Sequence, residues 1–242
     1  MYSILKKEIR SFLSSLIAYV VMIVFLVSIG LFMWILPNDN LFDMGYANLD
    51  TLFNMAPFVF IFLISAITMR SFSEEKKSGT IEILTTKPVS DVHIILGKYV
   101  AGISLVLFSL LPTLIYVYTV YQLGATKGNM DMGATWGSYL GLILLASCFV
   151  AIGIFSSAIS DNQIVSFILS AVLCFCFYSV FDLLANFNLL GTYDSIVAAL
   201  GIHAHYVSIS RGVIDSRDVL YFLSLITAFL WGTKTVFSAR KW

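Results

Sequence analysis

Two histidines near the C-terminal end have the spacing that comes nearest to a reactive site. His203 and His205 flank Ala204, and in an extended segment such an i,i+2 pair would place both imidazoles on one side, where they could ligate a metal. A stable site needs further ligands, and none follows at a recognisable spacing. Ser208 and Ser210 likewise have no acid partner for nucleophilic catalysis. An ordinary interfacial or hydrogen-bonding role for the histidines is therefore favoured.

Motifs for nucleotide binding and hydrolysis are missing from the sequence. There is no GxxxxGK[ST] loop to hold ATP phosphates, and there is neither HExxH nor GxSxG. Cys148, Cys174 and Cys176 lie inside apolar runs, where thiols pack as small apolar groups. We therefore expect no catalytic residue, no metal and no cofactor on this chain, which is not predicted to be an enzyme.

The composition is typical of a membrane protein. Hydrophobic residues make up 59% of the chain and charged residues 12%, with a mean hydropathy of +0.92. Soluble domains carry about 25% charged residues, so half that amount leaves too little polar surface to face water on all sides. The formal net charge is +0, which gives no basic field for nucleic acid. Membrane lipid is the expected surrounding, and nucleic acid is not an expected partner.

Six apolar runs are long enough to cross a bilayer, and backbone groups in lipid must then be satisfied within helices. We predict one all-α integral membrane domain over residues 1–242. Pro112 predicts a kink in the third span. Gly137 and Gly141, and then Gly153 and Ser157, predict close contacts of the fourth span with neighbouring helices. The predicted spans are 16–36, 51–69, 99–121, 137–159, 164–184 and 219–237.

The span interiors carry no central charge, and Asp182 stands near the outer end of the fifth span. Carriers driven by protons or sodium usually place ionisable groups at mid-membrane, so a secondary transporter is disfavoured. Filters and gating-arginine helices of ion channels are also missing. The energy for any movement must then come from another chain.

The basic residues predict the orientation. If the N-terminus is inside, only three of the 14 Lys and Arg residues fall in outer segments, namely Lys127, Arg211 and Arg217. The positive-inside rule therefore predicts that both termini lie in the cytoplasm. The predicted inner group comprises Lys6, Lys7, Arg10, Arg70, Lys76, Lys77, Lys87, Lys98, Lys234, Arg240 and Lys241.

The first fifteen residues have helical amphipathicity. Leu5, Ile9 and Phe12 recur on one side, while Lys7 and Arg10 take the other. This pattern predicts a helix lying flat in the inner interface before the first span, and a frayed basic anchor is the alternative. The first span has no small-x-small cleavage site and is longer than a signal peptide, so we interpret it as an uncleaved anchor.

The polar stretch 70–98 between the second and third spans is more structured than a connection requires. Arg70 and Glu74 lie four apart, which indicates that the second span continues as a helix into the cytoplasm. A break is predicted at Ser78-Gly79, followed by a short piece at 80–85 and an interruption at Pro88. Ser90 is a good N-cap for a helix that leads into the third span. We predict a helix–turn–helix elbow with a charged tip; an amphipathic linker on the lipid surface is the alternative.

The elbow carries a recognisable string of residues. It resembles the inter-span signature of ABC-2 type permeases and reads Glu74-Glu75-x-x-x-Gly79-Thr80-x-Glu82-x-Leu84, then Pro88-x-Ser90 and Gly97-Lys98. The outer segment before the last span is similar to the family's final segment and reads His205-Tyr-x-x-x-x-Arg211-Gly212-Val-Ile-Asp215, with Asp218 following. Within the family, the chain looks closest to the permease subunit associated with gliding motility in Bacteroidetes, the GldF type.

This resemblance implies that the chain resides in a bacterial inner (plasma) membrane, and it implies a role for each part. Residues 79–84 correspond to the coupling helix that docks on a separate ATP-binding-cassette ATPase, with Gly79 as the turn and Glu82 as the acidic contact. Thr80 and Leu84 belong to the same element, and Glu74 and Glu75 flank it. ATP and Mg would then bind the partner ATPase, and a second permease chain, homologous or identical, would complete the complex. Residues 185–216 correspond to an outer re-entrant hairpin with His205, Arg211, Gly212 and Asp215.

The expected function is thus the membrane-spanning permease subunit of an ATP-binding-cassette transporter complex associated with gliding motility. The alternative is a non-transporting membrane scaffold or a mechanical transmitter of a motility or secretion complex. A scaffold would not need the acidic tip of the elbow.

Overall fold

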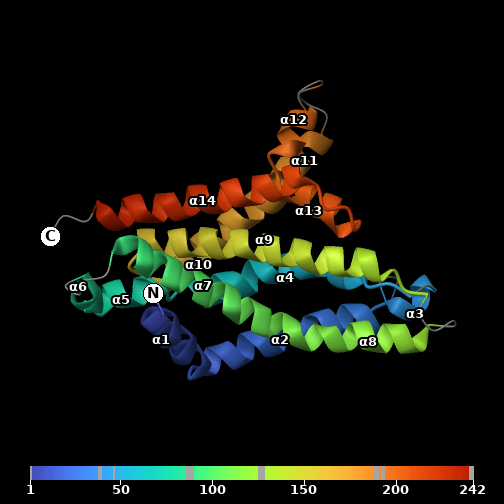
Figure 1. Cartoon of the computed structure of the whole chain (residues 1–242), viewed down its shortest axis with the longest axis horizontal. Helices are drawn as coiled ribbons and strands as arrows, with labels where there is room; N and C mark the ends of the chain where they lie inside the picture. The colour runs from blue at the N-terminus through green and yellow to red at the C-terminus, as the bar shows by residue number, and fades with distance from the viewer. Residues whose placement is uncertain are drawn as a thin grey trace.

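The computed structural model describes residues 2–37, 40–45, 47–85, 90–124, 129–187, 191 and 194–239 (Figure 1). These residues form helices and short connections and contain no strand, which confirms the all-α prediction. The side chain of Leu84 lies outside the described part. So do several residues used in the sequence argument, namely Lys87, Pro88, Lys127, Arg240 and Lys241.

Six helical segments among the described residues are long and apolar enough to cross a membrane, as predicted. Three of them are interrupted by a turn or by a change of helix type. The six are α2 (Leu16–Trp34), α4 with α5 (Asp50–Thr68, Ser73–Lys77), α7 with η1 and α8 (Asp91–Leu110, Leu111–Thr113, Leu114–Leu123), α9 (Met132–Ile159), α10 with η2 and α11 (Gln163–Phe175, Cys176–Val180, Phe181–Asn186), and α14 (Ser216–Ser238). The other helices are α1 (Tyr2–Leu13), α3 (Leu41–Met44), α6 (Thr80–Thr85), α12 (Asp194–Ala199) and α13 (Ile202–Ser210).

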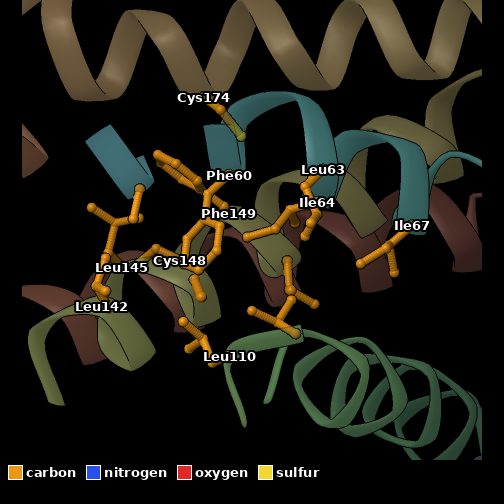
Figure 2. Close-up of a cluster of buried hydrophobic side chains, with 14 of the residues drawn as sticks. Phe60, Leu63, Ile64, Ile67, Leu110, Leu142, Leu145, Cys148, Phe149 and Cys174 are labelled. Carbon is orange, nitrogen blue, oxygen red and sulfur yellow. The ribbon is translucent and has the colours of Figure 1, made fainter. Parts of the chain in front are cut away.

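The helix α9 is the centre of the bundle and packs against α4, α7, α10, α13 and α14. Figure 2 shows part of the resulting core, in which Phe60 and Ile64 from α4 meet Leu145 and Phe149 from α9, with Cys174 of α10 beside them. Lipid tails are as apolar as these side chains, so close van der Waals packing rather than water exclusion stabilises such contacts.

Small residues on α9 allow the neighbouring helices to approach closely, as their spacing predicted. A Cβ on Gly153 would overlap the side chain of Thr68 and lie 2.8 Å from its Cβ. A Cβ on Gly137 would lie 2.9 Å from the Cα of Gly212. Ser157 receives two backbone hydrogen bonds from the start of α5. The fourth span therefore uses its small residues against α4, α5 and the segment after α13.

The proline in the third span interrupts the helix as expected. The segment changes at Leu110 from α7 to the 3-10 turn η1 and continues as α8 from Leu114. Pro112 lacks an N–H and cannot maintain the α-helical ladder. Thr113 donates its hydroxyl to the Leu110 carbonyl over 2.7 Å and lies 3.0 Å from the Tyr139 hydroxyl, which satisfies polar groups at the break.

The third segment begins earlier than the predicted 99, at Asp91, because the amphipathic helix after Ser90 runs into the span without interruption. Ser90 occupies the predicted N-cap position, but its Oγ lies 2.5 Å from His93 Nδ1 and caps no backbone amide. The second segment likewise extends past its predicted end through α5. Both extensions lengthen the polar region between spans two and three.

The ends of the bundle carry different elements (Figure 1). At one end, on the left of the view, lie α1, α5, α6 and the last turns of α14; at the other lie α3 and the end of α8. The helices α11 and α12 leave the bundle together on the side of α14. The chain then returns through α13, which packs against α9. The N-terminal helix and the elbow therefore lie at the same end of the bundle, as expected for two segments that are separated by two spans.

Candidate functional site

The base of the elbow is the turn between α4 and α5, and it is anchored on α9. The backbone N–H groups of Phe72 and Ser73 donate to Ser157 Oγ over 2.9 and 3.1 Å. The Ser157 hydroxyl donates in turn to the Met69 carbonyl over 3.1 Å, and Ser73 Oγ also donates to that carbonyl. These bonds satisfy the backbone groups that the interruption of the helix leaves unpaired.

A lysine connects α5 to the far end of α9. Lys76 Nζ donates to the Ala158 carbonyl over 2.5 Å and lies 3.2 Å from Asp161 Oδ1. Ala158 belongs to the last turn of α9, where unpaired carbonyls and the helix dipole favour a cation. The elbow therefore has a second attachment to the central helix.

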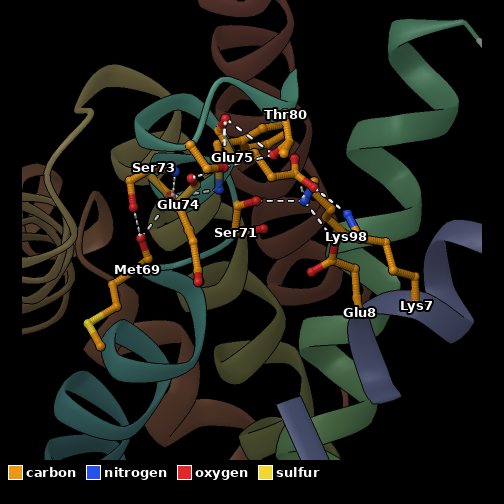
Figure 3. Close-up of polar contacts among 12 residues, drawn as sticks. Lys7, Glu8, Met69, Ser71, Ser73, Glu74, Glu75, Thr80 and Lys98 are labelled. Carbon is orange, nitrogen blue, oxygen red and sulfur yellow. Dashed lines mark hydrogen bonds and ion pairs between the residues drawn. The ribbon is translucent and has the colours of Figure 1, made fainter. Parts of the chain in front are cut away.

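A buried network of charges connects the elbow with α7 and α1 (Figure 3). Lys98 Nζ lies 3.0 Å from Glu75 Oε2 and 2.8 Å from Glu8 Oε1, and it donates to the Ser71 carbonyl over 2.6 Å. Lys7 Nζ lies 2.6 Å from the other oxygen of Glu75. The Lys98 side chain is 1% exposed, so its charge depends on these partners.

The surroundings of this network strengthen it. Lys98 Nζ lies 5.0 Å from the centre of the Phe72 ring, over which a cation is attracted by the ring's quadrupole. Phe72 is fully buried and packs on Phe237 of α14. At Lys7, burial disfavours the charged form, but the hydrogen bond and the charge of Glu75 outweigh it and raise the pKa of Lys7. Four helices thus meet around one lysine.

The tip of the elbow has the predicted break. Gly79 follows the end of α5 with a φ of 68°, a left-handed conformation that favours glycine. The helix α6 begins at Thr80, whose Oγ1 lies 2.9 Å from Ser78 Oγ. Glu82 is exposed, whereas the neighbouring Ile81 is 7% exposed and belongs to the core of this chain.

The two flanking glutamates of the motif face different ways. Glu74 is exposed, while Glu75 is 8% exposed and points into the charge network. The motif residues Gly79, Thr80 and Glu82 thus share one accessible tip, whereas Glu74 lines a cavity beside Arg70 at the base of the elbow. Glu75 instead holds that tip to the bundle.

On α13 the two histidines have separate partners, because residues two apart on a helix point in different directions. His205 Nδ1 lies 2.7 Å from Asp218 Oδ1, and its Nε2 lies 2.9 Å from the Ala199 carbonyl oxygen. The ring stacks on Tyr221 with 3.9 Å between centroids. His203 Nδ1 lies 3.6 Å from Asp182 Oδ1. The extended i,i+2 arrangement considered for a metal is therefore not formed.

The other residues singled out in the predicted outer segment shape the turn between α13 and α14. Arg211 ends α13 and is exposed. Gly212 has a φ of 85°, and a Cβ there would come 3.0 Å from the Cα of Ala134 in α9. Asp215 is the N-cap of α14, and its Oδ1 accepts from the Arg217 amide over 2.9 Å. These residues position α13 between α9 and α14.

Three residues of the charge network, Lys7, Glu8 and Lys98, were not predicted as site residues. Lys98 belongs to the family string and Lys7 to the polar face of the N-terminal helix, but neither was given a partner. A signal was present for Lys98. It lies on the stripe of α7 that also contains Ile94 and Ala101, and this stripe faces the core. A lysine on an apolar stripe requires an acidic partner, and such partners come from distant segments that spacing does not reveal.

Comparison with known proteins identifies the family. A family model described as "ABC-2 family transporter protein" matches residues 46–213, which is more than half of the chain and includes both the elbow and α13. No curated protein matches the chain. A multi-pass helical bundle agrees with the transport role of such membrane components. The chain therefore belongs to the ABC-2 transporter family, as a membrane-spanning permease of the kind that works with an ATP-binding-cassette ATPase.

Proposed function

We propose that this chain receives force from a separate ATPase subunit through the tip formed by residues 79–84. The ATPase would bind ATP and Mg, and its closure would move the elbow relative to the membrane. The spans would then change which side of the membrane is accessible, as in other rigid-body transitions.

The observation that carries this proposal is the firm attachment of an exposed tip to the bundle. Ser157 and Lys76 connect α5 to α9, and Lys98 connects it to α7 and α1. A linker lying on the lipid surface would not need these buried contacts. An element that transmits displacement does need them, because a loosely attached tip would move without moving the spans.

The finer assignments rest on resemblance and charge. The string around Glu82 supports a coupling role, and the similarity to the GldF type supports an association with gliding motility. The distribution of basic residues supports an inner-membrane location with both termini in the cytoplasm. A second permease chain would supply the other half of a path that one set of six spans does not enclose.

Charge reversal at Glu82 tests the coupling role. Glu82→Lys is expected to remove most of the co-purifying ATPase, or to uncouple ATP hydrolysis from the cellular phenotype, while membrane insertion stays normal. Asp194→Lys, the same kind of change on the distant helix α12, is the matched control. If Glu82→Lys keeps both ATPase binding and phenotype at normal expression, residues 79–84 are not the coupling element.

The mass of the solubilised complex tests the need for a second permease. We expect two six-span chains and the ATPase to elute together. A single permease chain that retains full activity with its ATPase would contradict this part of the proposal.

A further inference from the structure

A cavity of about 360 Å³ lies where α1, the start of α2, the end of α4 and α7 meet. Its volume falls within the range of small-molecule sites, about 300–1,000 Å³. One part of its lining is polar and includes Ser15, Arg70 and Glu74. The other part is apolar and includes Ile17, Ile67 and Leu105. A cavity with one polar and one apolar side fits an amphiphile better than a free polar ion.

Most of the charges around the cavity are already neutralised by each other. Lys98 pairs with Glu75 and Glu8, and Lys7 pairs with Glu75. Arg70 is different, because none of the described carboxylates forms an ion pair with it. The cavity therefore offers one cation whose charge is not used within the described chain.

Arg70 is held in place but incompletely bonded. Its Nη1 donates to Ser15 Oγ over 3.3 Å, whereas its Nε is buried and has no hydrogen-bond partner among the described residues. A buried guanidinium N–H without an acceptor is costly, and phosphate oxygens are well suited to this planar group. Ser15 is also the N-cap of α2, so the positive end of that helix faces the same place.

Glu74 supplies the opposite charge on the same cavity. Its carboxylate is exposed and forms no ion pair within the described residues. Arg70 and Glu74, neither of which forms an ion pair within the described residues, complement a zwitterion that has a phosphate at one position and an ammonium at another. The amphipathic helix α1, with Lys6 and Arg10 exposed on its polar face, lines the same cavity, and helices of this kind bind at the headgroup region of a bilayer.

We propose that this cavity binds the phosphoethanolamine headgroup of a phospholipid, with the phosphate on Arg70 and the ammonium on Glu74. The apolar side of the cavity accommodates the adjoining part of the lipid. The bound lipid joins α1, α2 and the base of the elbow. This site does not depend on ATPase coupling and holds for the chain with or without its partner.

Lipid binding to the full-length protein in detergent, after delipidation, tests the proposal by native mass spectrometry. The probes are dioleoyl phosphatidylethanolamine, phosphatidylglycerol and phosphatidylcholine, added separately. We expect the ethanolamine lipid to bind about tenfold more tightly than the other two, because only its headgroup offers Glu74 a positive charge with N–H donors. The choline ammonium has no N–H, and the glycerol headgroup has hydroxyl donors but no cation. Equal binding of all three lipids would overturn the assignment.

Two variants locate the site. Arg70→Gln should weaken binding of all three lipids by about tenfold or more, since each carries a phosphate. Glu74→Gln should lower the binding affinity of the ethanolamine lipid alone, to that of the choline lipid. Arg10→Gln, on the exposed face of α1 outside the cavity, is the control and should bind like the wild type. Unchanged affinity in Arg70→Gln, or unchanged selectivity in Glu74→Gln, would contradict the proposal.

Thermal unfolding in detergent checks that each variant is folded. Because Glu74 is exposed, Glu74→Gln should fold normally, so the selectivity test remains usable even if Arg70→Gln is unstable. Inorganic phosphate at millimolar concentration distinguishes a lipid from a free anion. We expect phosphate not to displace the ethanolamine lipid, because it lacks both the ammonium and the apolar part. Displacement by phosphate alone would contradict the proposal and show that the cavity binds free anions.

Discussion

Lys98 and Glu75, which are 23 positions apart in the sequence, form a buried ion pair of 3.0 Å beneath the elbow. Lys98 directly precedes the third predicted span, and Glu75 follows the second. Their side chains are 1% and 10% exposed. The pair thus closes the elbow at its base and leaves its tip accessible, which is the arrangement that the coupling proposal requires.

Removing this lysine should destabilise the protein strongly. Lys98→Met leaves Glu75 and Glu8 without their shared cation, and loss of one partner of a buried pair costs about 3–5 kcal/mol. Unfolding in mixed detergent micelles measures the change. Lys77→Met, at an exposed position of the same elbow, should change stability little.

A double variant separates the pair from the rest of the network. Without Lys98, the buried Glu75 has only the more exposed Lys7 as an ion-pair partner. Glu75→Gln in the Lys98→Met background removes this poorly compensated charge and should recover part of the lost stability. If the double variant is as unstable as the sum of the two single variants, the pair does not act as a unit.

The close packing of α4 against α9 should depend on the absence of a side chain at Gly153. Gly153→Ala places a methyl group against Thr68, and overpacking of this kind costs about 1–3 kcal/mol. Thr68→Ala in the same chain should relieve part of the effect, as measured by thermal unfolding. Gly133→Ala, in the first turn of the same helix, meets only Asp131 Oδ1 at 3.3 Å and should be nearly neutral. A Gly153→Ala protein as stable as the wild type would contradict the close approach of these two helices.

The pairing of His205 with Asp218 should hold α13 against α14. His205→Ala leaves the buried Asp218 without its partner, and an unsatisfied buried group costs about 1–3 kcal/mol. Hydrogen exchange of the amides in α13 should therefore become at least about tenfold faster. His203→Ala is the control, because His203 and Asp182 are 3.6 Å apart and both are 37% exposed. Equal effects of the two substitutions would refute a special role for His205.

Orientation is checked by labelling single cysteines in a chain whose three native cysteines have been replaced. With an impermeant thiol reagent on intact cells, Asp194→Cys should react and Lys77→Cys should not. After the membrane is permeabilised, Lys77→Cys should react as well, since it is exposed at the elbow. Reaction of Lys77→Cys in intact cells would invert the predicted topology.

Much of the fold follows from the sequence because the bilayer imposes strong local rules. Spans need about 20 apolar residues, and their backbone must be helical, so hydropathy alone predicts the six segments. The effects of Pro112 and Gly153 are local: Pro112 interrupts its helix because it lacks an N–H, and Gly153 allows close packing because it lacks a side chain. The elbow was likewise visible because Gly79 and Ser90 mark its turns locally.

The contacts that hold the elbow were decided only by the tertiary structure. Lys98 meets Glu8, Glu75 and the Ser71 carbonyl because α1, α5 and α7 converge, and no spacing in the sequence encodes that convergence. The same holds for Ile81, which is buried in this chain although it lies in the segment 79–84 that the family resemblance assigns to ATPase docking. Periodicity shows which residues share one face of a helix, but helix packing determines what that face meets.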